Sequence, residues 1–538
     1  MKRKVFIPLI AVALLLLGSG YKNDYFEIAK QVEIFTTMFK ELNMNYVDET
    51  NPAELMDTAI KNMLDELDPY TTFMNEQDVE SFKISTAGEY SGIGAVVRSF
   101  DDKLLVVEPY QGYPADKAGL KAGDEIVKIG DIEIADFKDD ATELLKGSAR
   151  SEVAITYRRQ GEVKSTTLNR EEIEIDAVPY FNMLDPETGY IVLSRFNSKA
   201  SEQTEAALVE LKEKGAKRII LDLRDNPGGL LGEAINICNL FVPKGELIVS
   251  TRSKVKKFNQ EYETRKKPVD TEIPLAILIN GRSASASEIV SGALQDLDRA
   301  VIIGGRSFGK GLVQRPVKLT YGTQLKVTIS RYYTPSGRCI QSLDYWNRDE
   351  NGNAVAKRSF NEFTTRNGRK VYDGGGVEPD ISIQSLKNND LTDALIENQV
   401  IFNFATDYYY EHPAPELSQF EFTPADYKDF VSYVRDLGLE YQTALEKELE
   451  KLEEENKIGE LGEVVSSKYR ELTAAIDASK FEALSTYQAN IQKNIEDELI
   501  KRYFYRKGLY DHYLKHDAAI LEAGNVLGNT SKYNEILN

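Results

Sequence analysis

The chain has 538 residues, 42% hydrophobic and 28% charged, which is long enough for several globular domains. Its formal net charge of −20 argues against a nucleic-acid partner, because no basic face for binding phosphates is expected. Cys238 and Cys339 could pair, but two isolated cysteines in this length are more typical of free buried residues than of a disulfide framework.

Residues 1–20 have the pattern of a targeting segment. Residues 2–4 are basic, residues 5–17 form an apolar run, and Gly18 and Gly20 supply the small side chains that a signal peptidase needs. The apolar run is too short to span a bilayer comfortably. We therefore expect an exported protein, periplasmic or otherwise extracytoplasmic, with an uncleaved membrane anchor as the alternative. Membrane association is expected only through this segment.

Residues 21–86 follow a helical pattern. Apolar residues recur near helical spacing between Phe26 and Phe39, and Asn51-Pro52 begins a second helix that runs to Leu67. This region predicts a helical packing domain and carries no sign of chemistry.

Residues 87–170 change to a strand-rich pattern. A Gly-rich entry, Tyr90-Ser-Gly-Ile-Gly-Ala, precedes one predicted strand, and Ala118-Gly-Leu-Lys-Ala-Gly-Asp follows another. Together they closely resemble a PDZ domain, a family that binds the C-terminus of a peptide by adding it as a strand to a sheet. The alternative is a β-rich domain without a ligand.

The PDZ resemblance implies a site for the substrate's tail. Backbone N–H groups of Gly92, Ile93 and Gly94 would hold the terminal carboxylate, and Lys146 could add a positive charge. The added strand would lie beside residues 95–98, and the resemblance implies a facing helix at about residues 137–145.

Residues 171–384 alternate between strands and helices, which predicts a mostly parallel sheet with loops gathered at the strand ends. A polar insertion at about residues 343–372 is expected at the surface. Residues 385–538 are helical and acidic, and the run at 446–463 is typical of a solvated helix or a partner surface. The fold class is thus an α/β core with a mostly parallel sheet, an inserted β-rich PDZ domain, and helical N- and C-terminal regions.

The stretch from Ile273 to Asp296 combines a buried strand, a tight turn and the start of a helix. Ser283, Ser285 and Ser287 lie at the turn, where a fold can present a nucleophile beside free backbone N–H groups. Serine is also a common cap at this position, so the stretch alone leaves both interpretations open.

A nucleophilic serine would need a base. The three histidines, at positions 412, 512 and 516, all lie outside the α/β core, so a histidine base is not expected. Lys310, flanked by two glycines after a buried strand, could act instead if burial lowered its pKa towards about 7–8.

Gly304 to Lys310 also fits the start of a phosphate-binding loop, but Gly311 replaces the Ser or Thr that would hold Mg²⁺.

Five motifs together resemble the carboxyl-terminal processing proteases, also called tail-specific proteases. They are Ser283-Ala-Ser-Ala-Ser-Glu, Phe308-Gly-Lys-Gly-Leu-Val-Gln, Asp222-Leu-Arg-Asp-Asn-Pro-Gly-Gly, Tyr333-Thr-Pro-Ser-Gly-Arg and Gly376-Val-Glu-Pro-Asp, and the resemblance spans Asp24 to about Ile383.

The resemblance implies a role for each matching residue. Ser285 would be the nucleophile, Lys310 the general base and Gln314 the group that orients the base. The N–H of Ala286 and that of Gly228 or Gly229 would form the oxyanion hole. Considered without the resemblance, the Pro-Gly-Gly sequence is suitable for an oxyanion hole but is ordinarily a plain turn.

The sequence therefore predicts a secreted or periplasmic serine endopeptidase that acts through an acyl-enzyme on unfolded or C-terminally tagged proteins, without metal or organic cofactor. Oligomer or adaptor contacts, where present, are expected at the helical termini. The alternatives are a catalytically inactive PDZ-type binding scaffold and, less favoured, a nucleotide hydrolase.

Overall fold

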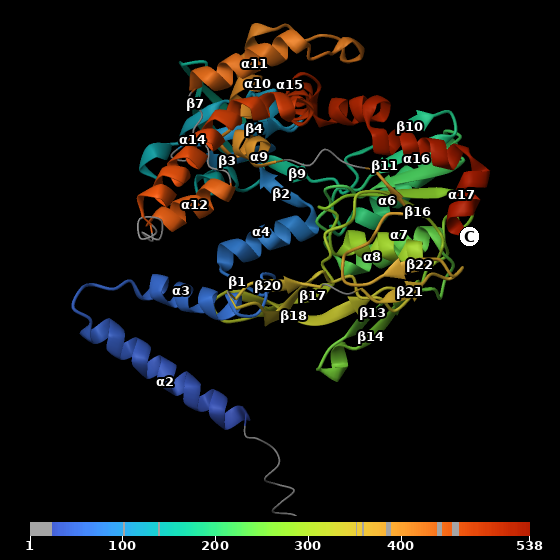
Figure 1. Ribbon diagram of the computed structural model, residues 1–538, viewed down its shortest axis with the longest axis horizontal. Helices are drawn as coiled ribbons and strands as arrows, with labels where there is room; N and C mark the ends of the chain where they lie inside the picture. Colours follow the sequence, from blue (N-terminus) through green and yellow to red (C-terminus); the bar gives the residue numbers. More distant parts are fainter. Residues whose placement is uncertain are drawn as a thin grey trace, which may run out of the picture. The chain divides into compact units, whose positions relative to one another are not determined.

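The computed structural model describes residues 24–538, except 101–102, 138–139, 351, 358–359, 384–388, 438–443 and 455–461. The expected targeting segment at residues 1–20 lies outside the described residues. None of the helices in the described part combines the length and apolarity that a membrane span needs. The described residues divide into two compact units, one of residues 24–74 and 316–327 and one of the remainder (Figure 1).

The smaller unit is mostly helical in its described part. It contains α2 (Asp24–Asn45) and α3 (Pro52–Asp65). The Asn51 side chain accepts hydrogen bonds from the first N–H groups of α3, and Pro52 occupies its first turn, so this helix begins where the sequence predicts. β1 (Thr72–Met74) then pairs antiparallel with the first residues of β18 (Gln324–Tyr333).

The larger unit opens with α4 (Glu76–Ala87), which leads into the PDZ domain. β2 (Glu89–Gly92) pairs antiparallel with β9 (Glu171–Glu174), so the two ends of the domain lie side by side. Between them a sheet forms in the order β3-β4-β5-β7-β8, with the short β6 beside β5. Its strands are β3 (Ala95–Phe100), β4 (Lys103–Pro109), β5 (Glu125–Ile129), β6 (Ile132–Glu133), β7 (Glu152–Arg159) and β8 (Glu162–Asn169).

Only short helices accompany this sheet. They are α5 (Pro114–Lys117) and the 3₁₀ turns η1 (Ile134–Asp136) and η2 (Ala141–Leu145). Of the helix implied at about 137–145, residues 138–139 lie outside the described residues, and the described part is the short 3₁₀ helix η2, which begins after Asp140, whose side chain accepts from the Thr142 N–H. Leu145 and Ala141 are nonetheless buried in the PDZ core, so η2 still closes one side of β3.

A six-stranded sheet forms the centre of the larger unit, in the order β10-β11-β12-β15-β16-β23. β10 is antiparallel to β11 and all the other neighbours are parallel, as the alternating pattern predicts. The strands are β10 (Tyr180–Asp185), β11 (Thr188–Val192), β12 (Arg218–Asp222), β15 (Leu275–Ile279), β16 (Val301–Gly304) and β23 (Ile381–Ser382).

Helices cover both faces of this sheet, which explains why its central strands are apolar throughout. One face packs on α6 (Ala200–Glu213), α7 (Leu231–Phe241) and α8 (Ala286–Asp296). The other face packs on α16 (Ala518–Gly528) and α17 (Thr530–Leu537) at the end of the chain (Figure 1). The C-terminal region thus completes the α/β core, although the sequence pattern placed it in a separate helical region.

A second sheet flanks α8. β13 (Leu247–Arg252) pairs with β14 (Gln260–Glu263) and with the end of β18, and β18 also pairs with β17 (Leu312–Lys318).

The expected surface insertion folds as two antiparallel hairpins. They are formed by β19 (Leu343–Arg348) with β20 (Ala354–Ala356), and by β21 (Glu362–Thr364) with β22 (Lys370–Tyr372). The insertion is not wholly superficial: Val371 is buried, and the side chain of Arg369 forms ion pairs with Asp298 and Asp380.

The remaining C-terminal helices form their own apolar core around Phe404 and Phe430. They are α9 (Asp390–Glu397), α10 (Val400–Glu411), α11 (Pro424–Leu437), α12 (Ala444–Glu454), α14 (Glu463–Thr486) and α15 (Gln488–His516), with the 3₁₀ turn η4 (Leu417–Gln419). α12 contributes no described residue to this core, and its described side chains lie mostly at the surface, in line with the solvated-helix interpretation of the run at 446–463. Residues 455–461 of that run lie outside the described residues.

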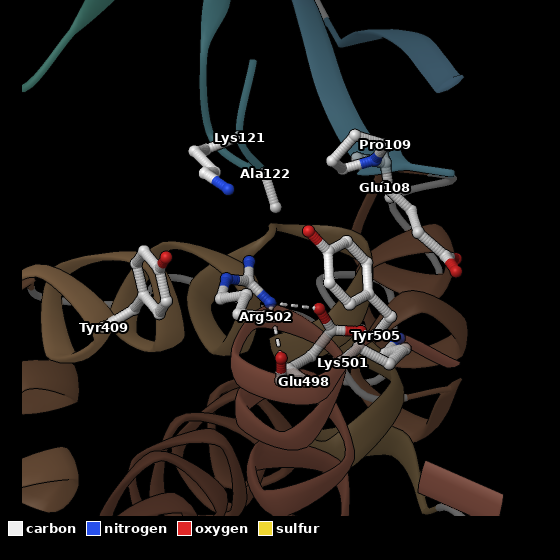
Figure 2. Close-up of a pocket in the computed structure, with 10 residues that line it drawn as sticks. Glu108, Pro109, Lys121, Ala122, Tyr409, Glu498, Lys501, Arg502 and Tyr505 are labelled. Carbon is white, nitrogen blue, oxygen red and sulfur yellow. Dashed lines mark hydrogen bonds and ion pairs between the residues drawn. The ribbon is translucent and has the colours of Figure 1, made fainter. Parts of the chain in front are cut away.

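This helical domain contacts the PDZ domain directly. Figure 2 shows a cavity between them, in which Lys121 and Ala122 of the PDZ domain face Arg502 and Tyr409. The helix α15 breaks at Tyr505, where φ is 57°, and the Tyr505 hydroxyl donates to Asp116 Oδ1 at 2.7 Å.

Candidate active site

Ser285 lies on the turn between β15 and α8, at the carboxyl edge of the central sheet. Its backbone has φ 55° and ψ −109°, which is unusual for a residue with a side chain and is a strained conformation. Ser283 and Ser287 are fully buried, and their hydroxyls donate to the carbonyl oxygens of Leu223 and Asn226 at 2.8 and 2.9 Å. The two flanking serines therefore anchor the turn, and Ser285 is the partly exposed one.

Glu288 lies in the first turn of α8 and is fully buried. Its carboxylate accepts four hydrogen bonds, at 2.8 Å from Ser285 N–H, 2.7 Å from Gly309 N–H, 2.9 Å from Lys310 N–H and 2.6 Å from Ser307 Oγ. One side chain thus ties the turn of the serine to the loop of the lysine.

The electrostatics of Glu288 balance two opposed effects. Burial disfavours the charged carboxylate, whereas its four hydrogen bonds favour it. Burial is the larger effect and raises the pKa of Glu288 from 4.5 to about 7. Sequence reasoning missed this residue, because a Glu three positions after a Ser at a helix start is also the ordinary pattern of a helix cap.

Lys310 follows β16 on a glycine-flanked loop and is half-buried. Tyr332, which is nearly fully buried on β18, makes a second bridge between the two segments. Its hydroxyl lies 2.6 Å from the carbonyl oxygen of Lys310 and 3.2 Å from that of Ser285. The backbones at Ser285 and Lys310 are therefore held together from two sides, by Glu288 and by Tyr332.

Gln314 lies on β17, and its Nε2 donates to Thr328 Oγ1 at 3.2 Å. The segment from Leu312 onwards is a strand, not a helix, so the Gly304–Lys310 loop lacks the helix that follows a phosphate-binding loop.

Gly228 and Gly229 lie beside the Ser285 turn. Both have positive φ, of 97° and 147°, and a side chain on Gly228 would meet Ala286 N at 2.9 Å. The Gly228 N–H donates to Asn226 Oδ1 at 2.9 Å. Among the described residues, no hydrogen bond occupies the N–H of Gly229 or that of Ala286.

The predicted tail-binding loop is at the entrance to β3. Gly94 has φ 72°, and a side chain there would meet Tyr113 Cβ at 2.4 Å, so both its conformation and its surroundings require glycine. The carbonyl oxygens of Ile93 and Gly94 accept from Ala115 and Tyr110. β3 is at the edge of its sheet.

Lys146 follows η2, and its ammonium forms an ion pair with Glu143 of that turn. The structure therefore gives this predicted site residue a partner within the chain.

Three segments of the chain match known families. Residues 187–345 match peptidase family S41, residues 91–169 match the PDZ domain, and residues 391–527 match the probable PDZ-protease C-terminal helical domain. The last match includes α16, which covers the second face of the central sheet.

Similar proteins carry consistent names. A carboxy-terminal-processing protease of Bartonella bacilliformis is 37% identical over 342 residues, which cover 62% of this chain and 77% of that protein. A probable CtpA-like serine protease of Staphylococcus aureus strain N315 is 28% identical over 442 residues, covering 81% and 80%. The solved structure of a photosystem II D1 C-terminal processing protease has 28% identity and a TM-score of 0.36, covering 65% of this chain and 86% of that one. This chain belongs to the carboxy-terminal-processing serine proteases of peptidase family S41.

Proposed function

We propose that this protein is an exported serine endopeptidase that cleaves proteins recognised by their C-terminal tails, with Ser285 as nucleophile and Lys310 as general base. The carrying observation is the buried Glu288 carboxylate, which binds the backbone N–H groups of both residues. A reaction between two side chains on separate loops requires that the loops keep a fixed separation, and this carboxylate supplies the constraint.

The chemistry follows from the two side chains. The neutral Lys310 amine takes the proton of the Ser285 hydroxyl as Oγ attacks the peptide carbonyl and the new C–O bond forms. Lys310 then gives that proton to the leaving nitrogen as the C–N bond breaks. In the second half, water attacks the acyl-enzyme carbonyl while Lys310 takes its proton. Lys310 then returns that proton to Ser285 Oγ as the ester C–O bond breaks and the acid product leaves. Gln314, two strand residues beyond Leu312, would orient the lysine.

The oxyanion would be held by the backbone N–H groups of Ala286 and Gly229. Between the two candidate glycines, Gly229 is favoured because the N–H of Gly228 is already bonded to the Asn226 side chain. Ala286 is the first residue of α8, where N–H groups have no partner within the helix and the helix dipole favours negative charge.

The substrate's tail would add as a strand to the exposed edge of β3. Such addition supplies backbone hydrogen bonds irrespective of sequence, and the Gly92–Gly94 loop would receive the terminal carboxylate. Lys146 would have to leave Glu143, or act as a pair with it, in order to contribute its charge.

The decisive experiment uses an unfolded reporter protein with an apolar C-terminal residue, and compares the wild type with Ser285→Ala. The wild type should cleave it and form an adduct on Ser285 that mass spectrometry detects, whereas the variant should do neither. The inactive-scaffold alternative instead predicts that the wild type binds the reporter's tail and leaves the chain intact. That result would contradict the proposed endopeptidase activity.

A further inference from the structure

Arg195 lies next to the glycine loop that borders Ser285. Its segment runs alongside that loop through three hydrogen bonds: Asn226 Nδ2 to the Leu193 carbonyl at 2.7 Å, Phe196 N–H to the Gly228 carbonyl at 3.1 Å, and Leu230 N–H to the Phe196 carbonyl at 2.8 Å. The backbone of Arg195 is thus held close to the Gly229 N–H.

Arg195 differs from its neighbour in burial. Phe196 is 1% exposed and packs in the apolar core between the central sheet and α6, α7 and α8. Arg195 is only partly buried, so its side chain is not part of that core.

Arg195 lacks a counter-ion. Its Nε is buried without a hydrogen-bond partner, and among the described residues no carboxylate pairs with its guanidinium. The contrast with arginines of the adjoining segments is sharp: Arg224 pairs with Asp222 and Asp517, Arg282 with Asp225, and Arg506 with Glu108.

The groups that act electrostatically on Arg195 come from two parts of the chain. They are Tyr110 of the PDZ domain and Arg506 and Tyr510 of α15. Burial lowers the pKa of Arg195, and the positive charge of Arg506 acts in the same direction. No acidic side chain is among these groups. Arg506 is itself paired with Glu108, so the cost here is that of the partly buried Arg195 guanidinium without a carboxylate partner, and an incoming anion would relieve it.

We infer that Arg195 binds a carboxylate of the substrate polypeptide close to the scissile bond, and so favours substrates with an acidic group there. The carboxylate comes from an Asp or Glu side chain or from a chain terminus within reach. This inference rests on the proposed function, because it places the substrate at Ser285.

The test uses unfolded reporters with one shared tail, in which the residues flanking the mapped cleavage point carry Glu, Gln or Lys. We expect the wild type to cleave the Glu reporter with kcat/KM about tenfold above the Gln reporter, equivalent to about 1.4 kcal/mol. Arg195→Gln should abolish that ratio, Arg195→Lys should keep part of it, and Arg195→Glu should shift the preference to the Lys reporter.

A matched control is Arg158→Gln, which removes the same charge from the PDZ surface, where Arg158 pairs with Glu125. This variant should keep the full preference for Glu. A short peptide with a free or an amidated terminus separates the two sources. Slower cleavage by Arg195→Gln that is confined to the free-terminus peptide assigns the carboxylate to the chain end, whereas a Glu-over-Gln preference that Arg195→Gln removes assigns it to a side chain.

The inference would be overturned if the wild type cleaved the Glu and Gln reporters equally and Arg195→Gln also slowed the free and the amidated peptide equally. Binding of the same reporters to Ser285→Ala gives a test independent of turnover. If the wild type cleaves nothing yet Ser285→Ala binds the Glu reporter more tightly than the Gln reporter, the proposed function fails and the assignment of Arg195 stands.

Discussion

We propose that a substrate contacts backbone N–H groups both at the Ser285 turn and at the Gly92–Gly94 loop, but the two places are built in opposite ways. Around Ser285, buried polar side chains fix the backbone: Glu288 accepts four hydrogen bonds and Tyr332 bridges two carbonyl oxygens. At the PDZ loop the backbone is held by hydrogen bonds from the N–H groups of Ala115 and Tyr110, and β3 is an edge strand of its sheet. Catalysis requires reactive groups held in fixed positions, whereas a peptide that adds as a strand requires a sheet edge that the domain leaves unpaired.

The first test of this comparison abolishes catalysis at the Ser285 turn while leaving tail binding at the PDZ loop unchanged. Ser285→Ala and Lys310→Ala should each lower kcat/KM by more than about 10³-fold, because the proposed nucleophile and base would act as one unit. Gln314→Ala should cost less, about tenfold, since an orienting group is less essential. Cleavage of the unfolded reporter gives these rates.

Binding of a fluorescent tail peptide is the control in these variants and should stay within about twofold of the wild type, because the PDZ groove is a separate structure. Wild-type turnover by folded Lys310→Ala would rule out the lysine as base.

Glu288→Gln tests whether the buried carboxylate fixes the site. The variant replaces one acceptor oxygen by an NH₂ group that faces N–H donors, so at least one buried donor loses its partner. We expect kcat/KM to fall by roughly 100-fold, since an unsatisfied buried donor costs about 1–3 kcal/mol. Tail binding should not change, which keeps the two regions distinct. Activity equal to that of the wild type would show that the turn is held without Glu288.

The same carboxylate predicts how stability depends on pH. Its folded pKa, about 7, lies above the ordinary 4.5, so the folded state holds the proton more tightly than the unfolded state. This contribution is complete below pH 4.5 and is lost as pH rises through 7, on the order of 3 kcal/mol. Urea unfolding between pH 4.5 and 8 should show this loss in Ser285→Ala and not in Ser285→Ala/Glu288→Gln. Parallel curves for the two proteins would contradict the raised pKa.

The contrast between the two regions also explains what the sequence could predict. Short motifs with distinctive spacing, such as the three serines and the glycine-flanked lysine, carry their identity locally, so the strand, turn and helix around Ser285 were predicted correctly. Glu288 was missed because its burial depends on the packing of the Ser307–Gly309 loop, which no local pattern encodes. The sequence pattern likewise places α16 and α17 in a separate helical region, because no local pattern shows that their apolar faces pack on the central sheet.

The role of the PDZ loop is tested by changing the C-terminal tail of the substrate. Amidation of the reporter's terminus removes the anion and should slow cleavage at least tenfold, about 1.4 kcal/mol, as expected for a hydrogen-bonded charge. Gly94→Ala should act similarly, because its φ of 72° and the nearby Tyr113 Cβ leave no room for a side chain. Ending the tail in Asp-Asp should also slow cleavage.

A short peptide that reaches Ser285 without the PDZ domain is the matched control for the tail experiments. Its cleavage should be unaffected by Gly94→Ala. Equal rates for free and amidated tails in the wild type would show that the PDZ domain does not select substrates by their ends.

The smallest effect is expected at the histidines, which belong to neither region. His412 stacks on Tyr408 with its Nδ1 3.0 Å from the Tyr408 carbonyl, and His512 and His516 stack on each other in α15. All three lie in the C-terminal helical domain. Replacing them together should leave kcat within about twofold of the wild type, because the proposed base is an amine. Activity should rise with pH in both proteins, since only the neutral amine accepts a proton. Burial lowers the pKa of His512, so any histidine contribution would appear on the acidic side of the profile. A folded but inactive triple variant, or activity that falls between mildly acidic and mildly alkaline pH, would refute a lysine base.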